Sequence, residues 1–188
     1  MGDLNKVGFL NGERIYLREV RLTDVNDNYH RWMNDPEVTR YLESRFFPSS
    51  VEDLRDYVNE RRNDRTSILL AIVIKSDQRH IGNIKLGSIN WIHRLADMGI
   101  LIGEKDCWGK GYATEAIRLV AGYAFEILNL HKLVAGVYSM NEGSSRAFLK
   151  AGFMREGAFK EHYFCEDRYV DSEMLGLDRK STRLNSSH

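Results

Sequence analysis

The feature that most constrains the fold is a glycine-flanked turn that leads directly into a long amphipathic helix. In the stretch CWGKGYATEA (residues 107–116), Gly109 and Gly111 enclose a lysine. Apolar residues then recur at positions 113, 116, 117, 120, 121, 124, 125 and 128, which is the spacing of one helical face. A chain with this pattern must bury the helix against a larger apolar layer, and the helix must begin with bare backbone.

Bare backbone ahead of a helix is typical of a site for a phosphate or pyrophosphate group. A helix N-terminus presents unpaired N–H groups and a positive dipole end, and glycine lets an anion approach the main chain. A nucleoside-triphosphate loop requires Gly-Lys-Ser/Thr, whereas Tyr112 follows Gly111 here. A dinucleotide fingerprint requires a third glycine where Thr114 stands, and no parallel βαβαβ series surrounds it. A tight strand-to-helix turn without a ligand is the remaining alternative.

The rest of the chain alternates between strand-like and helix-like patterns. Strands are predicted at residues 14–18, 67–74, 80–89, 95–102, 132–138, 154–164 and 168–177. Helices are predicted from Thr23 or Asp24 to about residue 33, from Ser49 or Ser50 onward, over 113–128 and over 144–151, with a short helical piece at 37–42 and Gly152 as a stop. Because no repeat or linker interrupts this order, we expect one mixed α/β domain.

Composition narrows the class of protein. Lys plus Arg and Asp plus Glu number 27 each, so the basic excess of a nucleic-acid-binding protein is missing. Cys107 and Cys165 form neither a metal-binding nor a disulfide pattern, which fits a reducing compartment. No apolar run reaches the roughly 18 residues of a membrane span, and the N-terminus lacks a signal-peptide core. We therefore expect a cytoplasmic protein with no nucleic-acid partner, no membrane partner and no metal.

The C-terminal segment differs in character from the rest. Residues 178–188 (DRKSTRLNSSH) show no apolar periodicity and resemble the translation of a common sequencing adapter. We interpret them as a non-native, adapter-derived tail and assign the domain to residues 1–177. A natural disordered tail is the alternative.

Two blocks of the sequence resemble the GNAT superfamily of N-acetyltransferases. Residues 107–116 are similar to the family pattern Gln/Arg-x-x-Gly-x-Gly/Ala, which binds the pyrophosphate of acetyl-CoA. Residues 141–153 (NEGSSRAFLKAGF) are similar to the family helix Asn-x-x-Ser/Ala…Lys-x-Gly-Phe. The resemblance extends over residues 13–177 and points to the ribosomal-protein alanine and spermidine acetyltransferase branch. It implies a mixed, mostly antiparallel sheet of about seven strands, flanked by about four helices and splayed between the fourth and fifth strands.

The resemblance also implies which residues bind acetyl-CoA as co-substrate. The backbone that holds the pyrophosphate would be that of Trp108, Gly109, Lys110, Gly111, Tyr112, Ala113 and Thr114. The preceding strand would bond the pantetheine arm through Ile100, Leu101 and Ile102, whose side chains can pack in the core at the same time. Asn141, Ser144 and Lys150 would contact the pantetheine and the adenosine phosphates, although a solvated helix lysine is an equal interpretation of Lys150.

Acetyl transfer to an amine further requires a base, an oxyanion donor and an acid. Asp97 stands where relatives often carry an acidic residue and is the candidate base, with His93 as a weaker candidate. A backbone N–H within residues 98–100 would polarise the thioester carbonyl. Many relatives use a tyrosine as the acid where Phe148 stands here, so the resemblance moves this role to Ser144, with Tyr138 as a spare phenol.

Two alternatives to this catalytic scheme stay open. A covalent route through Cys107 would use the thiol beside the helix N-terminus, which lowers a thiol pKa, but no histidine partner is apparent. A non-catalytic module that binds or senses CoA is the other alternative, because the usual tyrosine is missing.

The sequence indicates the chemical class of the acceptor, an amine, but not which amine it is. Residues 32–42 resemble branches that act on protein N-termini and nucleotide-linked amino sugars, whereas residues 89–97 resemble spermidine acetyltransferases. We expect a peptide or small-molecule amine as acceptor. Since the family is often dimeric, we also expect a homodimer.

Overall fold

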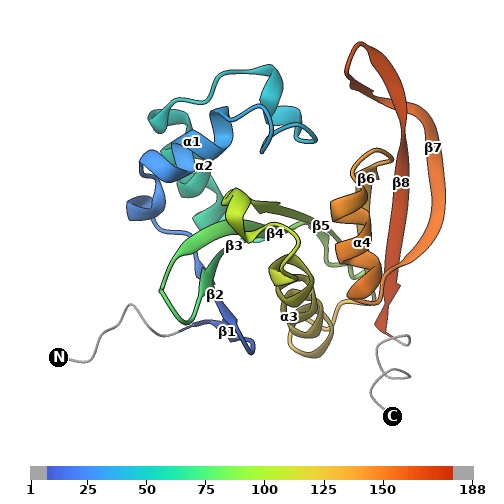
Figure 1. Ribbon diagram of the computed structural model, residues 1–188. Coiled ribbons are helices and arrows are strands. Elements are labelled where there is room, and N and C mark those ends of the chain that lie inside the picture. The colour runs from blue at the N-terminus through green and yellow to red at the C-terminus, as the bar shows by residue number, and fades with distance from the viewer. Residues whose placement is uncertain (1–7, 180–188) are drawn as a thin grey trace.

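Eight strands form one open sheet in the computed structural model, which describes residues 8–179 (Figure 1). The order across the sheet is β1-β2-β3-β4-β5-β6-β8-β7. The strands are β1 Leu10–Asn11, β2 Ile15–Glu19, β3 Ile68–Ile74, β4 His80–Asn90, β5 Leu95–Ile102, β6 Lys132–Tyr138, β7 Met154–Cys165 and β8 Arg168–Asp178. The helices are α1 Asp27–Asn34, α2 Val51–Asn63, α3 Tyr112–Glu126 and α4 Glu142–Lys150, with 3₁₀ turns η2 Leu22–Asp24, η3 Glu43–Phe46 and η4 Lys105–Cys107.

The single mixed α/β domain predicted from the sequence is confirmed. Every neighbouring pair of strands is antiparallel except β5 and β6, which are parallel. The eighth strand is the short β1, which continues the sheet through Leu10 and Asn11 opposite Leu17 and Tyr16. Its two residues are too few to produce an alternating pattern.

The segment between β2 and α2 differs most from the prediction. The side chain of Asn26 caps α1 by accepting hydrogen bonds from Asn28 N and Tyr29 N, so neither Thr23 nor Asp24 is the cap. Asp24 instead pairs with Arg18 through two hydrogen bonds of 2.7 and 2.8 Å. The helix predicted at residues 37–42 is a turn, and the helical residues lie later, in η3.

The start of α2 agrees with the prediction. Ser50 caps the helix and forms a reciprocal pair with Asp53, because each side chain accepts from the other residue's backbone N–H. The apolar residues Leu54 and Val58 are buried against β3. A polar cap followed by apolar residues at helical spacing is therefore enough to locate this element.

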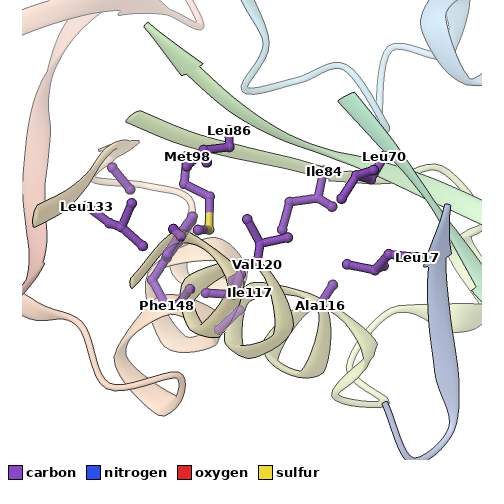
Figure 2. Close-up of a cluster of buried hydrophobic side chains, with 14 of the residues drawn as sticks. Leu17, Leu70, Ile84, Leu86, Met98, Ala116, Ile117, Val120, Leu133 and Phe148 are labelled. Carbon is purple, nitrogen blue, oxygen red and sulfur yellow. The ribbon is translucent and has the colours of Figure 1, made fainter. Parts of the chain in front are cut away.

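The main core lies between the sheet and α3 (Figure 2). The buried residues of α3 are Ala116, Ile117, Val120, Ala121, Ala124 and Phe125, which is the stripe expected from the sequence. On the other face of the sheet, α1 and α2 cover a second cluster that contains Tyr29, Trp32 and Val58 (Figure 1). Burial of a large apolar side chain contributes about 1.5–3 kcal/mol, so these two layers fix the sheet between them.

The sheet opens between β5 and β6, as predicted. These strands pair over only three positions, from Leu95 opposite Lys132 to Asp97 opposite Val134. In contrast, β4 follows β5 as far as Ile102, and β8 follows β6 as far as Tyr138. Beyond Asp97 and Val134, β5 and β6 therefore diverge, and we call this opening the wedge.

Only the first two residues of the predicted tail, 178 and 179, belong to the described residues. Asp178 ends β8 opposite Lys132, and Arg179 N donates to His131 O at 3.1 Å. Residues 180–188 lie outside the described residues, so the adapter interpretation stays a prediction.

Candidate active site

Gly109 and Gly111 form the turn that starts α3. Their φ angles are +72° and +84°, a left-handed conformation that costs other L-residues about 1–2 kcal/mol. Gly111 is the N-cap of α3 and has no side chain to bond the first amides. The N–H groups of Tyr112 and Ala113 at the start of the helix are consequently available to an anion, together with the positive end of the helix dipole.

Arg14, which precedes β2, holds this turn from the side. Its Nη1 donates to Lys110 O at 2.8 Å, and its Nε donates to Glu115 Oε2 at 3.0 Å. The guanidinium lies over the ring of Tyr112, 4.8 Å from the centroid. An added Cβ at Gly111 would lie 3.2 Å from Arg14 Nη2, so the guanidinium would have to shift by a few tenths of an ångström to admit it. Sequence reasoning missed Arg14 because its partners are about a hundred positions away.

Glu115 connects the turn to β2. Its Oε1 accepts hydrogen bonds from Arg14 N at 2.8 Å and Ile15 N at 3.2 Å. Burial alone would raise the pKa of this carboxyl, but the two backbone donors and the Arg14 guanidinium outweigh burial and lower it. Glu115 is therefore ionised at neutral pH and fixes the first turn of α3 to the sheet.

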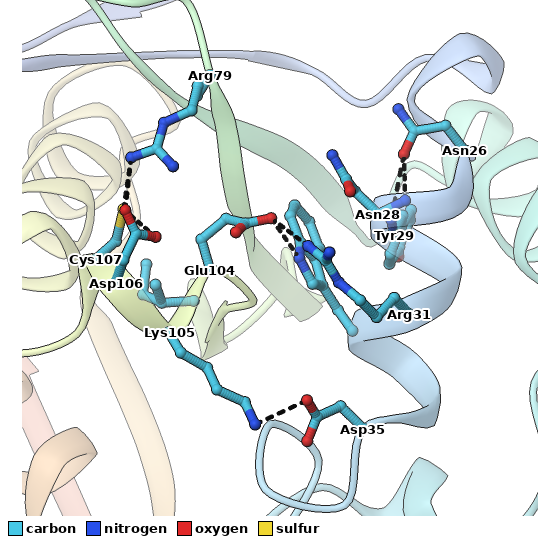
Figure 3. A network of polar contacts seen from close by, with 12 residues as sticks. Asn26, Asn28, Tyr29, Arg31, Asp35, Arg79, Glu104, Lys105, Asp106 and Cys107 are labelled. Carbon is cyan, nitrogen blue, oxygen red and sulfur yellow. Dashed lines mark hydrogen bonds and ion pairs between the residues drawn. The ribbon is translucent and has the colours of Figure 1, made fainter.

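Ion pairs anchor the segment between β5 and the glycine turn (Figure 3). Lys105 Nζ lies 2.9 Å from Asp35 Oδ2, and Asp106 Oδ2 lies 2.9 Å from Arg79 Nη2. Trp108 Nε1 donates to Ile102 O at 2.8 Å, at the end of β5. These contacts fix the position of the glycine turn relative to the open edge of β5.

A cleft of about 950 Å³ joins the glycine turn to the wedge. It is lined by most of the residues predicted to bind the cofactor: Ile100, Leu101, Ile102, Trp108, Gly109, Gly111, Tyr112, Ala113, Thr114, Asn141, Ser144 and Lys150. Tyr138 lines it as well. Lys110 is the exception, because its carbonyl accepts from Arg14 and its side chain is not part of the lining.

Asn141 and Ser144 lie at the start of α4. Asn141 is the N-cap, and its Oδ1 accepts from Ser144 N at 3.1 Å. The amide nitrogen of Asn141 and the hydroxyl of Ser144 remain to face the cleft. Phe148, at the position where a tyrosine was expected by resemblance, is buried and packs edge-on against Phe153.

Asp97 lies apart from the cleft lining, at the point where the wedge begins. It pairs with Gly87 of β4 and Val134 of β6. Its Oδ1 is buried and accepts no hydrogen bond from the described residues. Its charge contributes to a raised pKa of the Tyr57 phenol, for which burial is the larger cause.

A second hollow of about 400 Å³ lies on the α1 and α2 face of the sheet. Its lining includes Tyr29, Tyr57, Asp53 and Lys85. It shares Leu42, Glu43, Gly99, Ile100 and Leu101 with the larger cleft. The two spaces are therefore separated only by the open part of β5 and by the segment that leads into η3.

The structure argues against the covalent route through Cys107. The thiol is buried, and burial raises its pKa, with the nearby Asp106 carboxylate adding to the effect. The expectation that the helix N-terminus would lower the thiol pKa is therefore wrong for this residue. No cluster of His, Cys, Asp or Glu within residues 8–179 is grouped to hold a metal ion, and none of the helices described is long and apolar enough to span a bilayer.

The wedge, the glycine-led α3 and the helices on both faces together define a GNAT-like α/β fold. Comparison with known proteins agrees: the family model for the acetyltransferase (GNAT) domain matches residues 14–154. The spermidine N(1)-acetyltransferase of Vibrio cholerae is 33% identical over 139 residues, which are 73% of this chain and 78% of the relative. The probable N-acetyltransferase YjcK of Bacillus subtilis is 31% identical over 174 residues, 89% of this chain and 96% of the relative.

Similarity to solved structures extends over nearly the whole fold. The crystal structure of spermidine N-acetyltransferase from Vibrio cholerae in complex with CoA and spermine has a TM-score of 0.81 and 27% identity. The match covers 89% of this chain and 97% of that one. The chain therefore belongs to the GNAT family, as an N-acetyltransferase.

Proposed function

We propose that the chain transfers the acetyl group of acetyl-CoA to a primary amine, with both substrates bound at the same time. The observation that carries this proposal is the single cleft that runs from the amides of α3 to the open edge of β5. One end of the cleft offers amide donors to an anionic group, and the other offers an unpaired strand edge to an extended chain. These two features match the pyrophosphate and the pantetheine of CoA. The relative crystallised with CoA supports the choice of this co-substrate.

The residues of the cleft fit acetyl-CoA in chemistry as well as in shape. The amides after Gly111 are donors for the pyrophosphate, and the left-handed turn at Gly109 leaves no side chain over them. The backbone of Ile100, Leu101 and Ile102 has lost its β6 partner and offers hydrogen bonds to an extended arm. When bound, acetyl-CoA supplies an acetyl group activated as a thioester.

The amine would enter from the second hollow. It is protonated at neutral pH, by analogy with lysine at a pKa of about 10.4, and must lose a proton before it attacks. Asp97 is the proposed base, directly or through a water molecule, because its buried Oδ1, which has no hydrogen-bond partner among the described residues, lies at the closed end of the wedge. Ser144 and Tyr138 both line the cleft, and their hydroxyl groups are the candidates to donate a proton to the leaving sulfur.

The acceptor class is proposed from the lining of the second hollow and from the relatives. Glu43 and Asp53 contribute two carboxylates to this lining against the one ammonium group of Lys85, and this negative balance favours a cationic amine. The relatives named spermidine acetyltransferases favour a polyamine over a protein N-terminus or a nucleotide-linked amino sugar. The proposal includes a cytoplasmic location and a homodimer, for which β7, the longer of the two edge strands and largely exposed, offers a surface.

An amine panel tests the proposed function. Thiol release from acetyl-CoA is measured with polyamines, peptides with free N-termini and nucleotide-linked amino sugars. We expect turnover with polyamines. Binding of CoA without turnover of any amine would instead support the non-catalytic module that the buried Phe148 makes admissible.

Asp97→Asn tests the base. We expect turnover to fall about 100-fold while the Kd for CoA is unchanged, because the side chain lies outside the CoA cleft. Glu126→Gln, at an exposed acid that ends α3, is the control and should retain full turnover. A parallel loss of CoA binding in Asp97→Asn would show that Asp97 is structural.

A further inference from the structure

Tyr163 is a phenol in the cleft that sequence reasoning did not single out. Its ring stacks on Tyr138 with centroids 4.1 Å apart and an interplanar angle of 14°. His162 packs edge-on against the same ring at 4.8 Å. The Tyr163 side chain is thereby held in one orientation, and the structure places it in the cleft lining.

An irregularity in β7 brings Tyr163 to this position. Phe159 lies opposite Ser172 and Tyr163 lies opposite Val170, so four steps along β7 correspond to two along β8. Without this bulge, Glu161 would lie opposite Val170. Glu161 has a φ of +46°, a strained conformation for a residue with a side chain. Bulges of this kind redirect side chains next to active sites.

Asp171 of β8 stabilises the bulge. Its Oδ1 accepts from Glu161 N at 3.0 Å, and its Oδ2 accepts from Lys160 Nζ at 2.8 Å. These bonds offset part of the backbone strain, so the position of Tyr163 is maintained by its surroundings.

The hydroxyl of Tyr163 reaches the wedge. A Cβ built on Gly136 of β6 would lie 3.2 Å from the Tyr163 hydroxyl oxygen, so the phenol occupies the space that glycine leaves open. Gly136 is the second residue of β6 beyond Val134, where pairing with β5 ends. No hydrogen bond or ion pair of the Tyr163 hydroxyl occurs among the described residues, so its proton is free for a ligand.

We propose that Tyr163 is the catalytic residue that donates a proton to the departing thiolate, an inference that rests on the proposed acetyl transfer. The amine gives one proton to Asp97 and forms the C–N bond while the C–S bond breaks. The electron pair of the C–S bond stays on sulfur, which takes the phenol proton. The phenolate then recovers a proton from the new amide nitrogen through water, and Asp97 releases its proton to solvent.

Tyr163 suits this role better than the two hydroxyls predicted from the sequence. The Tyr138 hydroxyl lies 3.3 Å from Arg45 Nη1 and accepts a hydrogen bond from it. The Ser144 hydroxyl belongs to an alcohol, which is a far weaker acid than a phenol. The role that Phe148 cannot fill from α4 is thus filled from β7.

Tyr163→Phe tests the proposal through turnover. We expect kcat to fall about 100-fold with the Kd for CoA unchanged, and the matched variant Tyr169→Phe, at an exposed phenol of β8, to retain full kcat. Gly136→Ala is a second variant that keeps the phenol and displaces its hydroxyl, and it should lower kcat in the same direction. If Tyr163→Phe turns over as fast as wild type, the role proposed for Tyr163 is overturned and the proposed acetyl transfer still stands.

The thiol pKa of bound CoA provides a readout that needs no acceptor. Thiolate absorbance in the near ultraviolet is titrated for CoA bound to wild type, Tyr163→Phe and Ser144→Ala. A hydrogen bond from Tyr163 stabilises the thiolate, so the bound thiol pKa should be about one unit higher in Tyr163→Phe than in wild type. Equal values, or a shift confined to Ser144→Ala, would overturn the assignment. Failure of wild type to bind CoA would instead contradict the proposed function itself.

Discussion

Replacing Gly111 with alanine should weaken CoA binding and destabilise the fold by separable amounts. The φ of +84° costs alanine about 1–2 kcal/mol in the folded state. The new methyl group would also lie 3.2 Å from Arg14 Nη2 and disturb its bond to Lys110 O. For a chain of this size, each kcal/mol lowers Tm by about 2–4 °C, so we expect a decrease of about 2–8 °C.

Gly109 and Gly122 provide the matched comparisons. Gly109→Ala has the same kind of backbone strain, at a φ of +72°, but a Cβ there meets nothing within 4 Å, so its loss of stability should be smaller. Gly122→Ala lies inside α3, where a Cβ also meets nothing within 4 Å, and should raise stability by about 0.8–1 kcal/mol. Each effect is measured by thermal and urea unfolding.

The double variant Gly111→Ala/Gly122→Ala separates binding from stability. Its Tm should recover about half or more of the loss, while its Kd for CoA, measured by calorimetry, should stay about tenfold or more weaker, a loss of about 1.4 kcal/mol. The reasoning is refuted if CoA affinity recovers together with Tm, or if Gly111→Ala binds CoA as tightly as wild type.

Three further predictions concern ionisable groups around the site. Because the folded pKa of Glu115 is lowered, its stabilising effect should be complete above its unfolded pKa of about 4.3 and lost as pH falls through the folded value. The difference in unfolding free energy between wild type and Glu115→Gln should therefore shrink under acid conditions, and a constant difference from pH 6 to pH 3 would contradict this. Asp24→Ala leaves the Arg18 guanidinium buried without its partner and should cost about 3–5 kcal/mol in urea unfolding, whereas a cost below about 1 kcal/mol would count against the pair. Cys107 should react with a disulfide reagent about tenfold or more slowly than free cysteine at pH 7, and Cys107→Ala should retain turnover, whereas loss of acetyl transfer would revive the covalent route.

Local patterns were sufficient to predict the elements whose causes are local. The stripe of α3, the cap at Ser50 and the β-rich runs of β3 through β5 all lie within short windows of sequence. The wedge could be predicted because the glycine motif and the Asn141 block resemble a family with a splayed sheet. For the stripe, the cap and the strands, the residues that determine the feature are neighbours along the chain.

The features that were missed depend on contacts that the residue pattern does not reveal, and two of the three join residues far apart in the chain. Aspartate is a common helix-capping residue, but the carboxylate of Asp24 pairs with the buried Arg18 instead. Asn26 is the residue that caps α1. The bulge that turns Tyr163 toward Gly136 depends on the register between β7 and β8, which no local pattern specifies. Arg14 similarly reaches the glycine turn only because β2 and α3 pack together.

Calorimetric titration of the folded protein with CoA is the most direct test of the central claim. The account predicts saturable binding at one site per chain, and Gly111→Ala should weaken it. Absence of heat or of any shift in Tm with a well-folded sample at millimolar CoA would contradict the claim that the amides of α3 and the open edge of β5 form a CoA site.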